Sequence, residues 1–338
     1  MSVAGGTLRF VRPALKAGLL PVWRDRETVQ IGIDPRRAVA LTGMSHAALV
    51  LGLLDGSRDR DQVIEAAGQQ GIPEPVTDQI LTLLAAGGAL DDYPAAAIRA
   101  LPQDRRRRLA AELAAASLAR GHSDAGVAAL VRRDAARVQI YGSGRVAGTI
   151  TDILGTSGIG RVATTDTVRD RDGRDSQRPD PAHPAHPAHP ARPPHPDLAI
   201  LIGYQSLELA ASLMRAGIPH LAVAAAEAIG IVGPLVRPGR TACLRCLDLT
   251  RASLDPAWPL ILAQIVGRTA DPPACDAALA AAVAAQAAAQ ALAFIDRAQS
   301  AGPTENGTLE LVLPAWQWRR RTWPAHSSCG CDSRPPPT

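Results

Sequence analysis

Residues 137–166 most constrain how this chain can fold. The segment begins with a short apolar run at residues 138–141, which suits a buried strand of a parallel sheet. A glycine-rich stretch follows at once, in which Gly142 and Gly144 permit a tight turn and a close approach of the backbone to a phosphate. The pattern therefore predicts a strand, a tight turn, a helix and a second strand over residues 161–165.

The predicted helix covers residues 146–154 and begins with small side chains at Ala147 and Gly148, which would let it press closely on the strand. Asp166 ends the second strand about 20 residues after the turn, where a nucleotide fold places the carboxylate that binds a ribose hydroxyl. The sequence predicts a Rossmann-like α/β unit whose nucleotide-binding residues are Gly142, Gly144, Ala147, Gly148 and Asp166. Helix amides aimed at a phosphate would serve NAD, FAD or ATP equally, so the ligand stays open.

The chain of 338 residues is long enough for two domains with separate cores. Apolar residues make up 46% of it and aromatic residues only 3%, so these cores must be built of Ala, Leu, Val and Ile. The net charge is +4, yet Lys16 is the only lysine and arginine supplies the rest. Because this balance is typical of a compositional bias in the source genome, we expect no nucleic-acid partner.

The sequence predicts no membrane span, because we expect no apolar stretch of sufficient length, and the N-terminus lacks a signal-peptide pattern. We therefore expect a cytoplasmic protein without a membrane partner. Thiols stay reduced in the cytoplasm, so the five cysteines are expected to be metal ligands or reactive groups and not disulfides.

Residues 1–92 contain a self-contained pattern of strands and helices. Apolar runs at residues 21–23 and 28–33 flank a charged turn and predict a hairpin, and residues 38–41 could add a third strand. Three short helices should follow, opened by Ser45, by Asp59 and Asp61, and by Pro75 and Thr77. A small sheet beside three short helices predicts an α+β domain of the winged-helix type.

A winged-helix domain has three possible roles. A DNA reader would want a basic recognition helix, but residues 77–90 contain no lysine or arginine. A peptide reader would offer a sheet edge and a helix groove, which demand no basic stripe. A purely structural or dimerising module remains a third alternative.

Three segments of this domain carry a resemblance: VQIGIDPRRAVALTG, LLDGSRDRDQVIEAA and LLAAGGALDD. They resemble the PqqD-like leader-recognition domain of ribosomal peptide-modification systems. The resemblance covers about a quarter of the chain. It implies that residues 1–92 capture a precursor peptide as an added strand.

Residues 93–136 are predicted to be a helical linker, in which the arginine run at residues 105–108 forms a solvated helix face. Residues 169–197 are rich in Asp, Arg, His and Pro, and their prolines forbid helix and sheet. We expect a disordered or polyproline-II insert there. Loose metal trapping is the alternative, through His183, His186, His189 and His195.

Two cysteine pairs lie in the last third of the chain. Strands are expected at residues 198–202, 220–224 and 230–236, with a helix at 207–215, before a turn that delivers Cys243 and Cys246. Cys329 and Cys331 form the second pair, about 80 residues later. Together they supply the four ligands of a closed tetrahedral zinc site, which would stabilise the fold and catalyse nothing. A disulfide or a reactive thiol is the alternative.

Cys275 stands apart from these pairs, directly before a long alanine-rich helix expected over residues 276–297. A helix N-terminus would lower the pKa of a thiol, so Cys275 is the candidate reactive thiol. An ordinary buried cysteine occurs in the same setting, and this alternative stays open.

These features together resemble the ThiF/MoeB group over residues 137–331: a GxGxxA turn, the Gly158-Ile159-Gly160 stretch, a late CxxC pair, a cysteine that opens a long helix, and a terminal cysteine pair. Proteins of this group are similar to ubiquitin-activating enzymes and adenylate the C-terminus of a small carrier protein. The resemblance implies a Rossmann-like ThiF domain over residues 137–338. It would place Gly142, Gly144 and Asp166 against ATP, zinc on the four paired cysteines, and Cys275 at the crossover-cysteine position.

The chain departs from this family where a triphosphate would be held. The family has a second acid two residues after the first, then an asparagine and an arginine–glutamine pair, whereas Thr167, Val168 and the insert follow Asp166 here. A catalytic lysine is also expected, but Lys16 lies in the other domain. Because adenylation depends on positioning and electrostatics, we expect a degenerate site at which ATP binding is doubtful.

A peptide-capturing domain joined to a ThiF-like body with a damaged nucleotide site resembles the partner proteins of azoline-forming cyclodehydratases. The resemblance implies a zinc-stabilised scaffold that binds a leader peptide and presents the precursor to a separate modifying enzyme. An active ATP-dependent adenylyltransferase is the alternative, and a nicotinamide-dependent oxidoreductase is weaker because no hydride-transfer acid or base stands out. The family also implies a homodimer, for which the apolar helix that begins at Asp276 would be a suitable interface.

Overall fold

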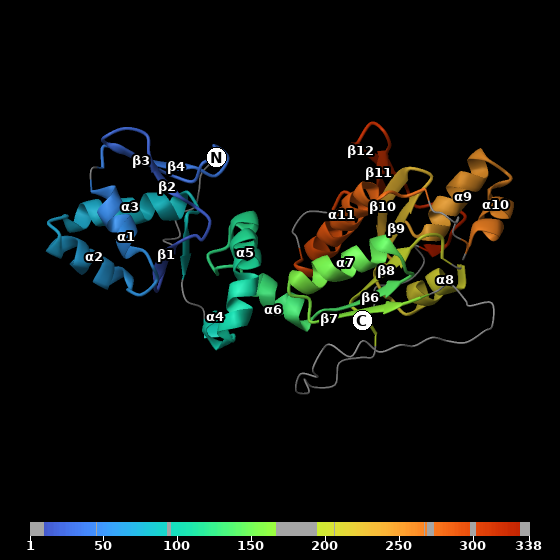
Figure 1. The fold of residues 1–338 in the computed structure, drawn as a ribbon, viewed down its shortest axis with the longest axis horizontal. Coiled ribbons are helices and arrows are strands. Elements are labelled where there is room, and N and C mark those ends of the chain that lie inside the picture. Colours follow the sequence, from blue (N-terminus) through green and yellow to red (C-terminus); the bar gives the residue numbers. More distant parts are fainter. Residues whose placement is uncertain are drawn as a thin grey trace. The chain divides into compact units, whose positions relative to one another are not determined.

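The chain divides into two compact units, Met1–Val131 and Arg132–Thr338 (Figure 1). The structure, a computed structural model, describes residues 10–44, 46–92, 96–166, 195–205, 207–266, 268, 274–297 and 302–331. The expected cap Ser45 and nearly all of the predicted insert, including His183, His186 and His189, lie outside these residues. The division falls inside residues 93–136, which the sequence predicted to be a linker.

The first unit contains two small antiparallel sheets. One has the order β2 (Pro21–Trp23), β3 (Thr28–Ile31) and β4 (Val39–Thr42), which confirms the predicted hairpin and its third strand. The other pairs β1 (Pro13–Leu15) with β5 (Leu90–Asp92), a pairing that the sequence did not predict. This pairing joins the first strand of the unit to the strand that follows residue 86.

The three predicted helices of this unit are α1 (Ala47–Leu53), α2 (Arg60–Gln69) and α3 (Glu74–Ala86). Asp59 caps α2 as expected: its Oδ1 accepts a hydrogen bond from the Gln62 amide at 2.8 Å, and Gln62 Oε1 accepts one from the Asp59 amide at 3.0 Å. The prediction for α3 needs correction. It begins at Glu74, and Thr77 is buried inside the helix instead of opening it.

Three further helices follow: α4 (Ala96–Ala100), α5 (Gln103–Arg120) and α6 (Val127–Ala135). A buried lysine ties α5 to the small sheet of β1 and β5. Lys16 Nζ lies 2.7 Å from Asp91 Oδ1 and donates to Ser117 Oγ and to the His122 carbonyl oxygen, each at 2.5 Å. Helix α5 is therefore an integral part of the first unit.

The second unit is built on a mixed sheet of seven strands, in the order β12-β11-β10-β9-β8-β6-β7. Strands β6 (Arg137–Tyr141), β7 (Arg161–Thr165), β8 (Leu198–Ile202) and β9 (His220–Ala226) run parallel. Strands β10 (Ile229–Val236), β11 (Gly307–Val312) and β12 (Gln317–Thr322) continue the sheet antiparallel. The predicted strands through β10 are confirmed, whereas β11 and β12 were not predicted.

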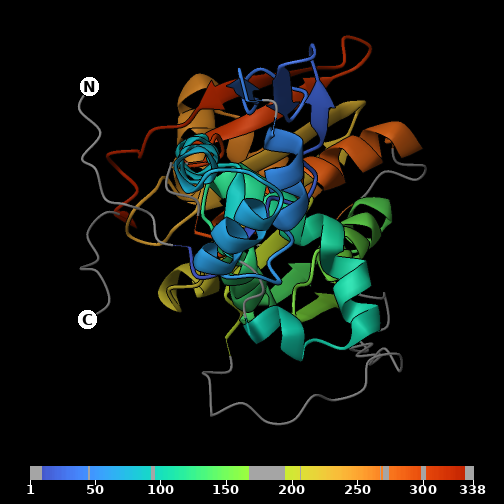
Figure 2. The same cartoon turned by 90° about the vertical axis from the view of Figure 1, so that its left-hand side faces the viewer.

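Helices cover both faces of this sheet. On one face, α7 (Arg145–Thr156) and α11 (Ala277–Ile295) pack side by side (Figures 1 and 2). Leu198 and Ile200 of β8 belong to the same hydrophobic core as these two helices. On the other face, the alternate residues Ala199 and Leu201 pack against α8 (Leu207–Arg215). Helices α9 (Leu244–Leu254) and α10 (Trp258–Ile265) complete the unit. The result is the mixed α/β architecture that the sequence predicted.

Helix α11 corrects one expectation. It is the one helix of the described residues that is long and apolar enough to cross a membrane, although the sequence analysis found no such stretch. Half of its most apolar window is buried inside the unit, as in the core helix of a globular protein. Leu279, Val283 and Ala287 belong to that core, and the expected homodimer interface on this helix stays a prediction.

Two glycines of this unit, Gly230 and Gly148, differ in how much space surrounds them. A Cβ on Gly230 of β10 would overlap Val283 Cγ2 of α11, so only glycine lets helix and strand approach here. Gly148, expected to have such a role, is exposed, and a Cβ there meets nothing within 4 Å. The buried Ala147 carries the packing of α7 instead.

We expect Gly230→Ala to lower the free energy of unfolding by about 1–3 kcal/mol, because the added methyl group has to displace Val283. Gly148→Ala should be neutral or raise it by up to about 1 kcal/mol, because alanine is the better helix former and meets no neighbour. Urea unfolding followed by circular dichroism measures both changes. Equal effects of the two substitutions would contradict this packing.

Candidate functional site

The first cysteine pair is held where β10 turns into α9. Cys243 is the N-cap residue of α9, and the Cys246 amide donates to the Cys243 carbonyl oxygen at 3.0 Å. The turn before it is fixed by Thr241 Oγ1, which accepts from the Arg237 amide at 2.8 Å. The Ala242 amide donates to Asn306 Oδ1 at 2.7 Å. Both cysteines are buried.

The second pair lies near the C-terminus, where Cys329 and Cys331 flank Gly330. Gly330 has a φ of 71°, in the left-handed region that glycine adopts without strain. The chain can therefore turn between the two cysteines so that both sulfurs face the first pair. The Cys329 amide donates to the His326 carbonyl oxygen at 2.9 Å, which fixes the approach to this turn.

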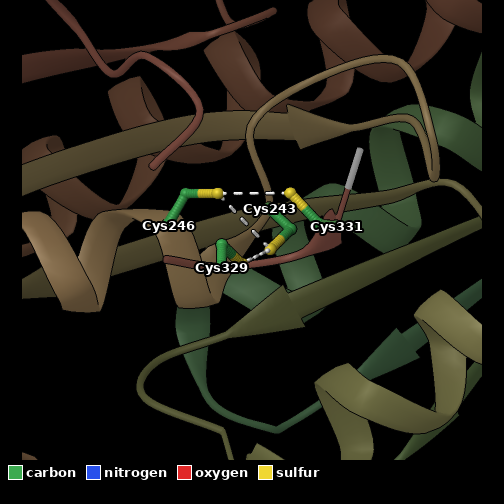
Figure 3. Close-up of side chains that lie close together, drawn as sticks. All are labelled: Cys243, Cys246, Cys329 and Cys331. Atoms are coloured by element: carbon green, nitrogen blue, oxygen red, sulfur yellow. Dashed lines mark hydrogen bonds between the residues drawn. The ribbon is translucent and has the colours of Figure 1, made fainter. Parts of the chain in front are cut away.

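The four sulfurs converge on one point (Figure 3). Cys243 Sγ lies 3.8 Å from Cys246 Sγ and 3.5 Å from Cys329 Sγ, and Cys246 Sγ lies 3.3 Å from Cys331 Sγ. All four are within 4.8 Å of one another. A tetrahedral zinc ion with bonds of about 2.3 Å would separate its sulfurs by about 3.8 Å. The cysteines are free thiols, so the alternative of a disulfide is wrong.

The electrostatics of the cluster also favour a cation. Burial and the neighbouring sulfurs raise the pKa of Cys329 to about 12, and burial raises the pKa of Cys331 further. For Cys246, burial opposes ionisation, but hydrogen bonds from the His326 and Cys243 backbone outweigh it and lower the pKa. Four thiolates this close repel one another unless a metal ion neutralises them. The residues therefore fit a metal ion, and a four-sulfur site leaves no open coordination position for catalysis.

A stack of tryptophan and arginine side chains lies beside the four cysteines. The Arg251 guanidinium of α9 lies 4.7 Å from the centre of the Trp258 ring and 5.3 Å from that of Trp323, and Arg321 lies 4.3 Å from the Trp323 ring. Trp323 is buried and donates from Nε1 to Thr308 Oγ1 at 3.0 Å. The stack ties α9 and α10 to the segment that carries Cys329. Sequence reasoning missed it because these residues share no local pattern.

The second candidate site lies at the carboxyl ends of the parallel strands. Because β7 and β8 lie on opposite sides of β6, the strand order reverses there, which is where open α/β sheets bind ligands. Gly142 and Gly144 have φ values of 115° and 90°, and a Cβ on Gly142 would lie 2.9 Å from Ile202 Cβ. Asp166 directly follows β7. The structure therefore brings the turn and the acid to one edge of the sheet.

Few ionisable groups accompany them. Among the described residues that follow β6, β7 and β8, namely 142–145, 166 and 203–205, Asp166 is the only carboxylate and Arg145 the only cation. The Gln205 amide folds back onto the Ile202 carbonyl oxygen beside Gly142. Lys16, the only lysine of the chain, is buried in the first unit.

Cys275, the candidate reactive thiol, is half-buried directly before α11, and its surroundings do not lower its pKa. Burial and then the negative charge of Asp276 raise the pKa of the Cys275 thiol, and the charge of Arg145 opposes them only in part. The helix N-terminus does not activate the thiol because Asp276 caps it, with Oδ1 accepting from the Leu279 amide at 2.7 Å. The reactivity of Cys275 stays a prediction.

Comparison with known proteins shows similarity at the level of the fold. No protein-family model and no curated protein matches the sequence. The crystal structure of E. coli MccB with AMPCPP and selenomethionine MccA is 15% identical, with a TM-score of 0.62, over 96% of this chain and 100% of that one. A heterocyclase in complex with substrate and cofactor is 18% identical, with a TM-score of 0.63, over 95% of this chain.

The heterocyclase TruD is 16% identical, with a TM-score of 0.61, over 95% of this chain. This chain spans only 40% and 42% of the two heterocyclase chains. Both kinds of neighbour match nearly the whole length of this chain. The chain therefore has the fold that E. coli MccB and the heterocyclase TruD share.

Proposed function

We propose that this chain is a zinc-stabilised, ThiF-like cytoplasmic scaffold that binds a precursor peptide and presents it to a partner modifying enzyme, without adenylation activity of its own. Two of the structures that this chain resembles are complexes, one of MccB with MccA and one of a heterocyclase with its substrate. The chain spans 40% of that heterocyclase chain and 100% of the MccB chain.

One observation supports the scaffold hypothesis: few of the charged groups that adenylation requires lie among the described residues at the strand ends. The described residues at the carboxyl ends of β6, β7 and β8 contain one carboxylate, Asp166, where a nucleotide with its metal ion would need more than a ribose ligand. Lys16 is fixed by Asp91 and Ser117 inside the first unit. A site with so little charge is a poor catalyst of pyrophosphate release.

The peptide-binding site is assigned to residues 1–92, read as a PqqD-like winged-helix domain. Because β3 lies in the middle of its sheet, β4 has an open edge among the described strands. Helix α3 packs beside β4 so closely that a Cβ on Gly87 would overlap Val39 Cγ2. Leu83 of α3 is 39% exposed. An extended peptide could add to β4 and place apolar side chains on α3.

Leu83→Asp is expected to weaken binding of a leader peptide at least tenfold, or about 1.4 kcal/mol, because it puts a charge on the apolar face of the groove. The probe is a fluorescein-labelled peptide with the sequence of a short precursor encoded beside the gene, measured by anisotropy with the full chain. Leu49→Asp, on α1 and 47% exposed, is the matched control and should bind normally. Equal binding by both variants would remove the groove as the site.

An active adenylyltransferase remains the second candidate, because Gly142, Gly144 and Asp166 lie at one edge of the sheet and MccB is also known in complex with ATP. ATP–pyrophosphate exchange in the presence of the peptide separates the two functions. The scaffold gives no exchange above background. Exchange that disappears in Asp166→Asn would establish the enzyme and end the scaffold hypothesis.

A further inference from the structure

Strand β12 leaves one side of its backbone open. It pairs with β11 along its whole length, from Gln317 opposite Val312 to Thr322 opposite Gly307. Its other side has no strand partner among the described residues, and Figure 1 shows β12 as the outermost strand of the sheet. An open edge is a row of unpaired N–H and C=O groups that can accept another strand.

The side chains of this edge carry positive charge that the protein does not neutralise. Arg319, Arg320 and Arg321 are consecutive and exposed. Arg320 donates only to uncharged oxygens, those of Pro303 at 2.8 Å, Thr322 Oγ1 at 2.9 Å and Glu305 O at 3.2 Å. Within the described part of the chain, none of the three arginines forms an ion pair.

One carboxylate on the neighbouring strand lies opposite β12, and the net charge of the edge stays positive. Glu310 lies opposite Arg319 in the register of β11 and β12, and its Oε1 accepts from Thr308 Oγ1 at 2.9 Å. Arg321 lies over the Trp323 ring, which supplies no negative charge. Three arginines against one glutamate make the edge complementary to an acidic segment.

Exposed apolar side chains lie at the beginning of the same edge. Trp316, in the turn between β11 and β12, is 47% exposed, and Val312 is 46% exposed. Tryptophan and arginine are the residues that most often dominate binding energy at protein interfaces. The edge therefore combines an aromatic anchor, a row of cations and unpaired backbone groups.

We propose that β12 binds an extended acidic segment of a partner protein as an eighth strand of the sheet. The backbone groups of Gln317–Thr322 would pair with the added strand, Arg319 would contact its carboxylates, and Trp316 would anchor one end. That this partner is the modifying enzyme rests on the proposed function. Strand addition itself does not, because it concerns only the second unit.

The test uses the full chain and a fluorescein-labelled eight-residue peptide of alternating glutamate and valine. Anisotropy should show binding that weakens as salt is added, and hydrogen exchange should show new protection of residues 317–322. Arg319→Glu should weaken binding at least about tenfold, and Trp316→Ser should weaken it by a similar factor. Arg108→Glu reverses another exposed charge, on α5, and should have no effect.

Three results would overturn strand addition: no binding, equal binding of a peptide with proline at its centre, or binding without protection of residues 317–322. Each of these results would mean that the arginines serve only to prevent aggregation through the open edge of β12. Arg319→Glu should also leave binding of the leader peptide to the first unit unchanged. Failure of this inference is therefore distinguishable from failure of the proposed function.

Discussion

Cys243→Ser is expected to abolish metal binding and to destabilise the second unit by several kcal/mol, or about 10 °C in its Tm. The sulfur is one of four that converge within 4.8 Å, and a structural zinc ion contributes its binding energy directly to folding. Serine is a favourable N-cap residue, so α9 keeps its cap and the effect reports the metal ligand alone. The metal content by atomic absorption and the Tm by calorimetry measure the two effects.

The matched control is Cys275→Ser, which changes the same atom outside the cluster and should keep one metal ion per chain. Cobalt substitution gives a second measurement, because four thiolate ligands produce an intense charge-transfer band that three do not. A full complement of metal in Cys243→Ser, or no metal in the unmodified protein, would contradict the zinc site. Either result would mean that the four cysteines do not together hold a structural ion.

Lys16→Met is expected to destabilise the first unit by about 3–5 kcal/mol, because it leaves the carboxylate of Asp91 buried without its counter-ion. The side chains of Lys16 and Asp91 are 1% and 6% exposed, and their atoms lie 2.7 Å apart. Urea unfolding of the full chain, followed by a probe of the first unit, measures the loss.

Arg36→Met is the control for this ion pair, because Arg36 also lies 2.7 Å from its partner, Asp34, but is 87% exposed. It should cost less than about 1 kcal/mol. The double variant Lys16→Met with Asp91→Leu should recover part of the stability, since it buries no unpaired charge. Equal losses in Lys16→Met and Arg36→Met would show that burial does not determine the strength of this pair.

Local features of the sequence were enough to predict the elements around the glycine turn. Strand β6, helix α7 and strand β7 follow one another within 30 residues, and the glycines occur where the backbone adopts φ values of 115° and 90°. The same holds for the capped helix α2, whose capping box is contained in four residues. In each case the stabilising contacts lie close in sequence, so the pattern alone specifies the structure.

Contacts between distant residues were decided only by the tertiary structure. The pairing of β1 with β5, the ion pair of Lys16 with Asp91, and the edge strand β12 join segments whose sequences carry no sign of their partners. The sequence predicted a lowered pKa for Cys275 from the helix N-terminus alone, whereas burial and the neighbouring Asp276 raise this pKa. The spacing of the cysteines in the sequence predicted two pairs of metal ligands. Only the packing of β10, α9 and the C-terminal segment brings the four sulfurs together, because the two pairs are far apart in the sequence and their distance in space depends on the folded sheet.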